Sequence, residues 1–174
     1  MYCIKENEMM KYKLLLAVCI LLLCSCSQVD SIKWSNNITN SYNQIKIDLT
    51  DYEDLISIET IGDSTANQAI SSKAEQMLLN IGQIKEELLS SPIPVEGEAY
   101  QEASIKTFEC IENQINAGLG FLGLTENSSE TNIEEYAIAY DIASKKTVDH
   151  IDNLRTIQEE FLRQVETAEA AQDI

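Results

Sequence analysis

From residue 30 onward, apolar side chains recur at alternating steps of three and four residues, with polar and charged residues between them. Four successive segments share this rhythm. Their apolar positions are Trp34, Ile38, Tyr42, Ile45, Leu49, Tyr52 and Ile56 in the first, Ile70, Ala74, Met77, Ile81, Ile84 and Leu88 in the second, Ile105, Phe108, Ile115, Leu119 and Leu122 in the third, with Ile111 beside them, and Tyr136, Tyr140, Ala143, Thr147, Ile151, Leu154, Phe161 and Val165 in the fourth. Such spacing places the apolar residues on one face of an α-helix. The pattern therefore predicts four amphipathic helices, each with one apolar stripe.

Turn-forming residues separate these segments. The interruptions are residues 62–64 (Gly-Asp-Ser), 90–97 (two prolines and a glycine) and 127–129 (Asn-Ser-Ser). Thr65 followed by Gln68, and Thr131 followed by Glu134, match the capping box that begins a helix.

These breaks predict helices near residues 30–60, 65–90, 97–124 and 132–170. Because the joins are short, neighbouring helices should run antiparallel. The predicted fold class is an all-α, up-down-up-down four-helix bundle.

The first helix has a competing interpretation. Residues 45–49 alternate in polarity as a β-strand does, and Thr50 with Glu53 would begin a separate, shorter helix. A lone strand would have no visible partner in this chain, so one continuous helix is preferred.

The first 26 residues have a different composition. Lys11 and Lys13 precede an uncharged apolar run over residues 14–23. A helix needs about 20 apolar residues to cross a bilayer, so this run is too short to span one. A basic start, a short apolar middle and small residues at the end are typical of a secretory signal. Met10 is a natural start for such a signal, so we expect residues 1–9 to be an over-extended beginning.

The end of this segment, Leu23-Cys24-Ser25-Cys26, resembles the lipobox of bacterial lipoproteins. The resemblance implies that the Cys26 sulfur receives a diacylglyceryl group and that cleavage leaves Cys26 as the new N-terminus. Residues 1–26 are then the signal peptide and residues 27–174 the folded domain. The alternatives are an ordinary signal peptide or an apolar first helix of the fold.

The residues on either side of Cys26 indicate in which membrane the lipid anchor would lie. Ser-Cys-Ser is similar to the signals of Bacteroidota, and Ser27 is not the aspartate associated with retention in the inner membrane. The resemblance thus implies an anchor in the outer membrane of the cell envelope.

The domain is strongly acidic. The first 26 residues hold three of the 12 basic and two of the 29 acidic residues, which leaves residues 27–174 with 9 basic and 27 acidic residues and a net charge of −18. This charge argues against binding nucleic acid or anionic lipid headgroups. It favours solubility and repulsion of neighbours, with a docking face for a basic partner or divalent cations as the alternative.

The candidates for chemistry are few. His150 is the only histidine, and no Glu-x-x-His pair of the kind found in di-metal bundles is present. Cys110 is the only cysteine after Cys26, and the neighbouring Glu109 and Glu112 should raise its thiol pKa. We therefore expect no catalytic residue, no cofactor and no metal site, and a protein that is not an enzyme.

Residues 117–124 (Ala-Gly-Leu-Gly-Phe-Leu-Gly-Leu) are the most unusual stretch. Its glycines either let neighbouring helices approach closely or end the helix in an apolar turn. A functional interpretation makes it an exposed apolar tip, because side chains spread around a continuing helix cannot all enter one core. Leu119, Phe121 and Leu122 are then the candidate contacts with a partner.

Two functions remain open. The domain resembles small, acidic, helical lipoproteins of bacterial envelopes, which implies a non-enzymatic interaction module held on the membrane by its lipid, with an unidentified protein partner. The alternative is a carrier that holds a small apolar ligand between its helices. The aromatic residues that would line its pocket are Tyr42, Tyr52, Phe108, Tyr136 and Tyr140.

Overall fold

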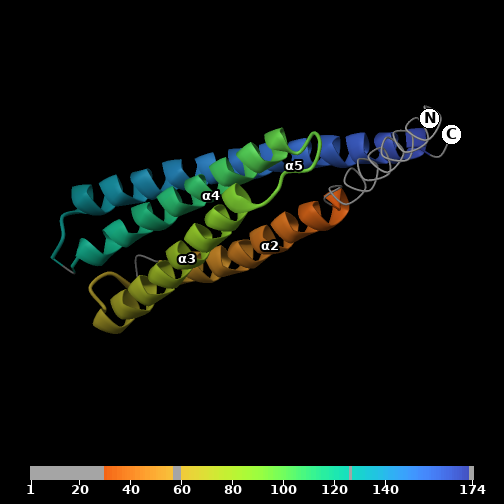
Figure 1. Ribbon diagram of the computed structural model, residues 1–174. Helices are drawn as coiled ribbons and strands as arrows, with labels where there is room; N and C mark the ends of the chain where they lie inside the picture. Colours follow the sequence, from red (N-terminus) through yellow and green to blue (C-terminus); the bar gives the residue numbers. More distant parts are fainter. Residues whose placement is uncertain (1–29, 57–59, 126, 173–174) are drawn as a thin grey trace, which may run out of the picture.

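The computed structural model describes residues 30–56, 60–125 and 127–172. Four long helices account for most of these residues: α2 (Ser31–Leu55), α3 (Ser64–Ser90), α4 (Glu98–Leu119) and α5 (Glu130–Gln172). A short 3₁₀ helix, η2 (Gly120–Gly123), follows α4. No strand occurs within the described ranges. The predicted all-α, four-helix bundle is confirmed (Figure 1).

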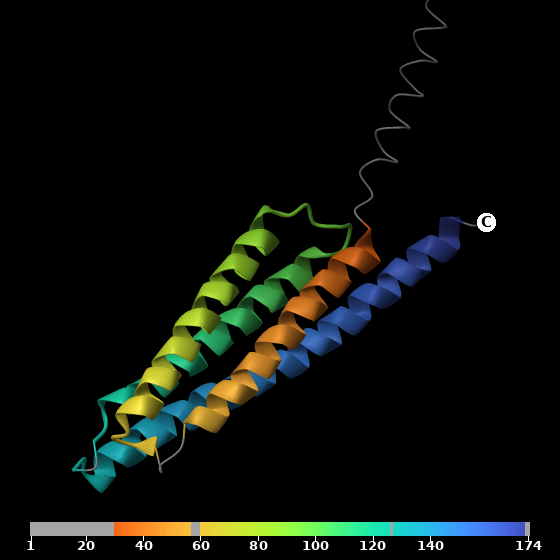
Figure 2. The ribbon, with the colours of Figure 1, turned by 90° about the horizontal axis from the view of Figure 1, so that it is seen from below.

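Successive helices run in opposite directions (Figures 1 and 2). The start of α2, the connection between α3 and α4, and the end of α5 all lie at one end of the bundle. The α2–α3 and α4–α5 connections lie at the other end. With 43 residues, α5 is about 65 Å long, and its last turns project beyond the other helices.

The caps of α3 and α5 differ from the predicted capping boxes. The Asp63 carboxylate accepts hydrogen bonds from the backbone N–H groups of Thr65 (2.7 Å) and Ala66 (3.2 Å). The Ser129 hydroxyl accepts one from the N–H of Asn132 at 3.3 Å. Thr65 and Thr131 therefore lie inside their helices, and the prediction that they begin them was wrong. A carboxylate is the stronger acceptor, and its charge is favourable at a helix N-terminus.

Helix α2 is continuous through the segment that alternates like a strand. Ile45 and Leu49 enter the core, while Ile47 lies on the outer face. The Thr50 hydroxyl donates to the Lys46 carbonyl oxygen inside the same helix, so Thr50 does not begin a new one. The helix ends at Leu55, earlier than the predicted residue 60, and Ile56 is extended.

Most of the core follows the predicted stripes. Tyr136, the first position of the predicted fourth stripe, is 40% exposed, and Tyr100 and Ala103, which lie outside the predicted third stripe, are buried. The buried apolar side chains of the core come from all four helices: Trp34, Ile38, Ile45, Leu49, Tyr52, Ile70, Ala74, Met77, Ile81, Leu88, Tyr100, Ala103, Phe108, Ile111, Ile115, Leu154 and Phe161. Trp34, Tyr100 and Phe161 form an aromatic cluster near the start of α2, with ring centroids 5.6–5.7 Å apart. Offset and edge-to-face ring pairs of this kind add stability beyond the area that they bury.

Helix α4 packs most extensively against α5. Small side chains on α4, including Ala103, Thr107 and Cys110, are buried there. The Thr147 hydroxyl of α5 donates to the Cys110 carbonyl oxygen (3.1 Å), and the Thr107 hydroxyl of α4 lies 3.3 Å from the His150 carbonyl oxygen. Threonine hydroxyls can reach the backbone of the facing helix only because the two helices are close.

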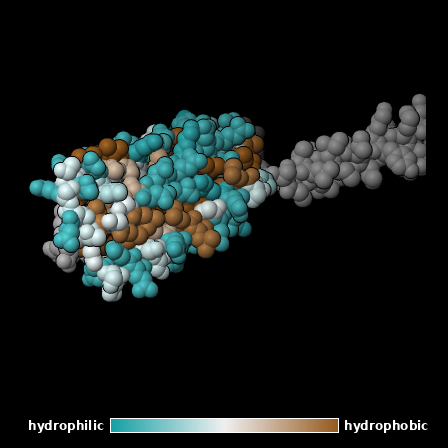
Figure 3. Space-filling model, turned by 90° about the vertical axis from the view of Figure 1, so that its left-hand side faces the viewer, coloured by the Kyte–Doolittle hydropathy of each residue, from teal (hydrophilic) through white to brown (hydrophobic). Residues whose placement is uncertain are grey.

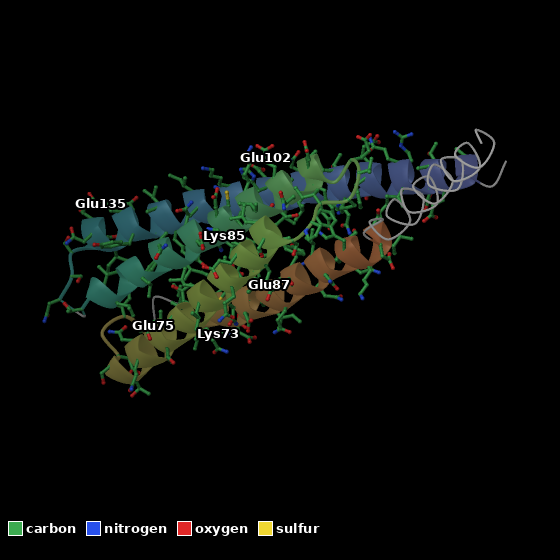
Figure 4. All side chains as sticks on the ribbon, in the orientation of Figure 1. Lys73, Glu75, Lys85, Glu87, Glu102 and Glu135 are labelled. Carbon is green, nitrogen blue, oxygen red and sulfur yellow. The ribbon has the colours of Figure 1, made fainter. Side chains whose placement is uncertain are left out.

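Ion pairs tie α3 to both of its neighbours. Lys73 binds Asp48 (2.8 Å) and Asp51 (3.2 Å) of α2, and Lys85 binds Glu112 of α4 at 2.7 Å. Figure 4 shows both lysines together with glutamates on the outer faces of α3, α4 and α5. Most of the acidic charge is therefore in contact with solvent. Within the described part of the chain, no helix is both long and apolar enough to cross a bilayer.

Two aspartate substitutions on α3 test the core. Ile81 is fully buried, whereas Leu79, two residues earlier, is 63% exposed. Ile81→Asp should cost about 3 kcal/mol or more, because it places an unpaired carboxylate in the core. Leu79→Asp should leave the melting temperature nearly unchanged. Thermal unfolding followed by circular dichroism measures both, and equal melting temperatures would contradict this core.

Candidate functional site

Two sites are expected from the sequence, and the described residues include only one of them. Cys26, the expected lipid-bearing residue, lies outside the described residues. It precedes Asp30, the cap of α2, by four residues. The expected partner contact, Leu119 to Leu122, lies where α4 ends and η2 begins.

The apolar segment 119–124 folds back onto the bundle. Phe121 is 9% exposed and Leu124 is buried, while Leu119 and Leu122 are half-buried against the core. The Phe121 ring lies 6.4 Å from the Tyr136 ring and 6.1 Å from the Tyr140 ring, measured between centroids. The expectation of an exposed tip was wrong for Phe121: α4 continues into the 3₁₀ helix, and the Phe121 ring is packed against α5.

The glycines of this segment permit close contacts. A Cβ atom on Gly118 would lie 2.5 Å from the Tyr52 hydroxyl oxygen and 2.5 Å from Ile56 Cδ1. A Cβ atom on Gly120 would lie 2.6 Å from Cδ1 of Tyr136. Such distances are too short for a real side chain. Both structural interpretations of the glycines are confirmed: they allow close approach, and the α-helix ends early in an apolar turn.

This end of the bundle retains some apolar surface. Figure 3 views the molecule from the end that carries the α2–α3 and α4–α5 connections, and it shows apolar side chains between polar ones. Leu119 and Leu122 are the residues of the expected contact that keep partial exposure here. Their contact with a partner stays a prediction.

A polar cluster lies next to this segment. The Gln114 side chain is buried, and its Nε2 atom donates to Oε1 of Glu53 (2.7 Å) and to the Tyr140 hydroxyl oxygen (3.3 Å). The Tyr52 hydroxyl donates to the Ile115 carbonyl oxygen at 2.8 Å. This cluster joins α2, α4 and α5. Sequence reasoning missed it, although Gln114 stands beside Ile115 among the apolar positions of α4.

The tyrosines of this cluster are neutral hydrogen-bonding groups. Burial raises the pKa of the Tyr140 hydroxyl; the hydrogen bond from Gln114 lowers it, and the nearby Glu53 carboxylate raises it. Burial also raises the pKa of the Tyr52 hydroxyl. Neither hydroxyl is activated as a base, so the cluster holds helices together and does not resemble an acid–base site.

A second polar layer joins α2 to α5 nearer the other end. Nε2 of Gln158 donates to the Thr39 hydroxyl oxygen at 2.7 Å, and that oxygen lies 3.4 Å from the Tyr100 hydroxyl. The Trp34 Nε1–H group is buried beside this layer and has no hydrogen-bond partner among the described residues. Helices α2 and α5 are thus linked by polar side chains at two levels of the bundle.

His150 and Cys110 stand apart from any cluster with catalytic geometry. His150 is half-buried on α5, and the described residues contain no group of three or more histidine, cysteine or acidic side chains placed to hold a metal ion. Cys110 is buried; burial raises the pKa of its thiol, Lys146 lowers it, and Glu109 raises it. Glu112 instead binds Lys85.

The aromatic residues considered for a ligand pocket do not lie together in the structure. Tyr52 and Phe108 are fully buried by the helices around them. Tyr136 and Tyr140 pack on Phe121 near the α4–α5 connection, and Tyr42 is half-buried on α2. Tyr52 and Phe108 belong to the hydrophobic core.

Phe121→Ser measures the role of the apolar turn. Because Phe121 packs on two tyrosine rings, its truncation should lower the free energy of unfolding by about 3 kcal/mol. Urea unfolding of wild type and variant gives the value. An unchanged urea midpoint would mean that Phe121 lies outside the core, as the interpretation of residues 117–124 as an exposed apolar tip requires.

Two glycine-to-alanine variants test the close approach at Gly118. Gly118→Ala should destabilise the protein by about 1–3 kcal/mol, because the new methyl group meets Tyr52 and Ile56. Gly82→Ala is the matched control: Gly82 is also inside a helix, but no atom lies within 4 Å of its added Cβ. It should stabilise the protein by about 1 kcal/mol through helix propensity. Urea unfolding measures the free energy of unfolding of both variants. Changes of the same sign would contradict the close contact of Gly118 with Tyr52 and Ile56.

No protein-family model matches the chain, and no curated protein or solved structure is significantly similar to it.

Proposed function

We propose that this protein is a bacterial envelope lipoprotein, anchored by lipid on Cys26, whose four-helix bundle is a non-enzymatic interaction module. The observation that carries the proposal is the Leu23-Cys24-Ser25-Cys26 sequence at the end of a short basic and apolar leader. This leader ends four residues before the capped start of α2. The lipid would therefore be attached directly beside the folded domain. We propose the outer membrane as the site of the anchor, because Ser27 follows Cys26 in place of the aspartate associated with retention in the inner membrane.

Features of the domain support a role in binding more than in catalysis. The thiol of Cys110 is buried with a raised pKa, which disfavours its use as a nucleophile. The buried tyrosine hydroxyls of the Gln114 cluster also have raised pKa values and donate or accept hydrogen bonds within the fold. The full burial of Tyr52 and Phe108 within the core favours an interaction module over a carrier of an apolar ligand.

Cys26→Ala tests the anchor, with Cys24→Ala as the matched control. Cys26→Ala removes the sulfur that would receive the lipid, so the leader should stay attached and a fatty-acid label should not be incorporated. Cys24→Ala leaves that sulfur in place, and its lipid labelling and mass should equal those of wild type.

Metabolic labelling with an alkyne fatty acid and intact-mass analysis provide the two readouts. Equal labelling of the Cys26→Ala variant and wild type would contradict the proposal, and so would a mature wild-type protein without acyl groups.

A further inference from the structure

Exposed apolar side chains form two groups within the described residues. One lies on α5 (Tyr136, Ile138, Ile142 and Val148), and the other lies at the corner between α3 and α4. Val95 is 82%, Leu89 67% and Ile93 39% exposed. A single exposed apolar residue needs no explanation, but these three fall within seven consecutive residues. Residues 89–97 contain one charged side chain, Glu96, in a chain of which 24% is charged. We call residues 89–95 the apolar corner.

The backbone of the corner holds Val95 outward. The Gly97 N–H donates to the Pro94 carbonyl oxygen at 2.9 Å, which closes a four-residue turn with Val95 at its tip. Glu96 has φ of 65°, a left-handed conformation that usually needs glycine. Pro94 and Gly97 are buried beneath the turn. Packing thus supports the strained backbone at Glu96. Strain of this kind is found at functional sites, where the surrounding structure holds a residue in one conformation.

The corner lies at the end of the bundle where α2 begins (Figures 1 and 2). Asp30 caps α2, and four peptide units separate it from Cys26. Fully extended, four residues span at most about 14 Å. A lipid on Cys26 would therefore hold this end of the bundle within that distance of the bilayer.

We propose that the apolar corner docks on the surface of the bilayer in which the Cys26 lipid is inserted, with Val95, Leu89 and Ile93 entering the interfacial layer. This inference rests on the proposed lipidation of Cys26. Apolar side chains at a membrane surface bury to a depth of about 5–10 Å, which suits side chains at the tip of a protruding turn. Lipid then covers apolar surface that would otherwise face water.

Charge favours a bilayer of neutral or zwitterionic lipids over a second copy of the chain. Residues 27–174 carry a net charge of −18, so two copies of the domain repel each other. The last turns of α5, with Glu166 and Glu169, project from this end on the side away from the corner (Figure 2). Docking of the corner would require the bundle to lean toward its α3 side, and this orientation would keep the Glu166 and Glu169 carboxylates in water.

Docking at the corner would also set which surface faces a partner. The end that carries Leu119 and Leu122 is opposite the corner, so it would point away from the membrane. The expected partner contact would then be presented to the surrounding compartment.

Site-directed spin labelling of the full-length lipoprotein tests this inference. In a Cys110→Ser background, Val95→Cys and Leu79→Cys each receive a nitroxide, and the purified protein is reconstituted in phosphatidylcholine vesicles. Leu79 is the matched control: it is 63% exposed, and it lies about 15 Å before Leu89 along the same helix. Collision rates with oxygen, which enters lipid, and with a water-soluble nickel chelate report the depth of each label.

The label at residue 95 should show a several-fold higher ratio of oxygen to nickel collisions than the label at residue 79. Equal ratios at the two positions, in protein whose mass shows the acyl groups, would overturn the docking and leave the anchor intact. Spin–spin broadening at residue 95 without a gain in oxygen collisions would identify a second copy as the occupant and overturn the bilayer. A mass without acyl groups would overturn the anchor and the docking with it.

Discussion

The close packing of α4 on α5 is the interaction on which the arrangement of this bundle depends. Small side chains such as Ala103 and Thr107 let the two helices approach until threonine hydroxyls reach carbonyl oxygens of the facing backbone. Helix α2 contacts α5 much less extensively than α4 does. Gln158 of α5 reaches Thr39 of α2 directly, and Gln114 of α4 bridges Glu53 of α2 and Tyr140 of α5. Hydrogen bonds at two levels can fix the register of α2 against α5 where apolar contact alone would allow sliding.

The up-down-up-down topology has a consequence for function. It places the start of α2 and the α3–α4 corner at one end, and Leu119 and Leu122 at the other. An anchor at Cys26 and a contact surface at the far end would therefore be separated by the length of the bundle. On this account the long helices act as a spacer: lipid holds one end, and the other reaches away from the membrane.

The sequence predicted the helices and most of the core. Apolar residues spaced three and four apart match the 3.6-residue turn of an α-helix and not the two-residue alternation of a β-strand. It misplaced the caps of α3 and α5, because Asp63 and Ser129 compete with the nearby threonines and only the backbone path decides between them. The burial of Phe121 depends on a 3₁₀ turn that periodicity does not reveal. The Gln114 cluster depends on Glu53 and Tyr140, which are far from it in sequence. The proposed lipidation of Cys26 rests on a resemblance alone, and Cys26 lies outside the described residues.

The anchor at Cys26 is the central claim, and the N-terminal peptide of the mature protein tests it most directly. Trypsin should release residues 26–33, since Lys33 is the first basic residue after Cys26. In protein isolated from bacterial cells, mass spectrometry of this peptide should show Cys26 as the first residue, carrying a diacylglyceryl group. A mature protein that begins at another residue, or an unmodified Cys26, would contradict the account.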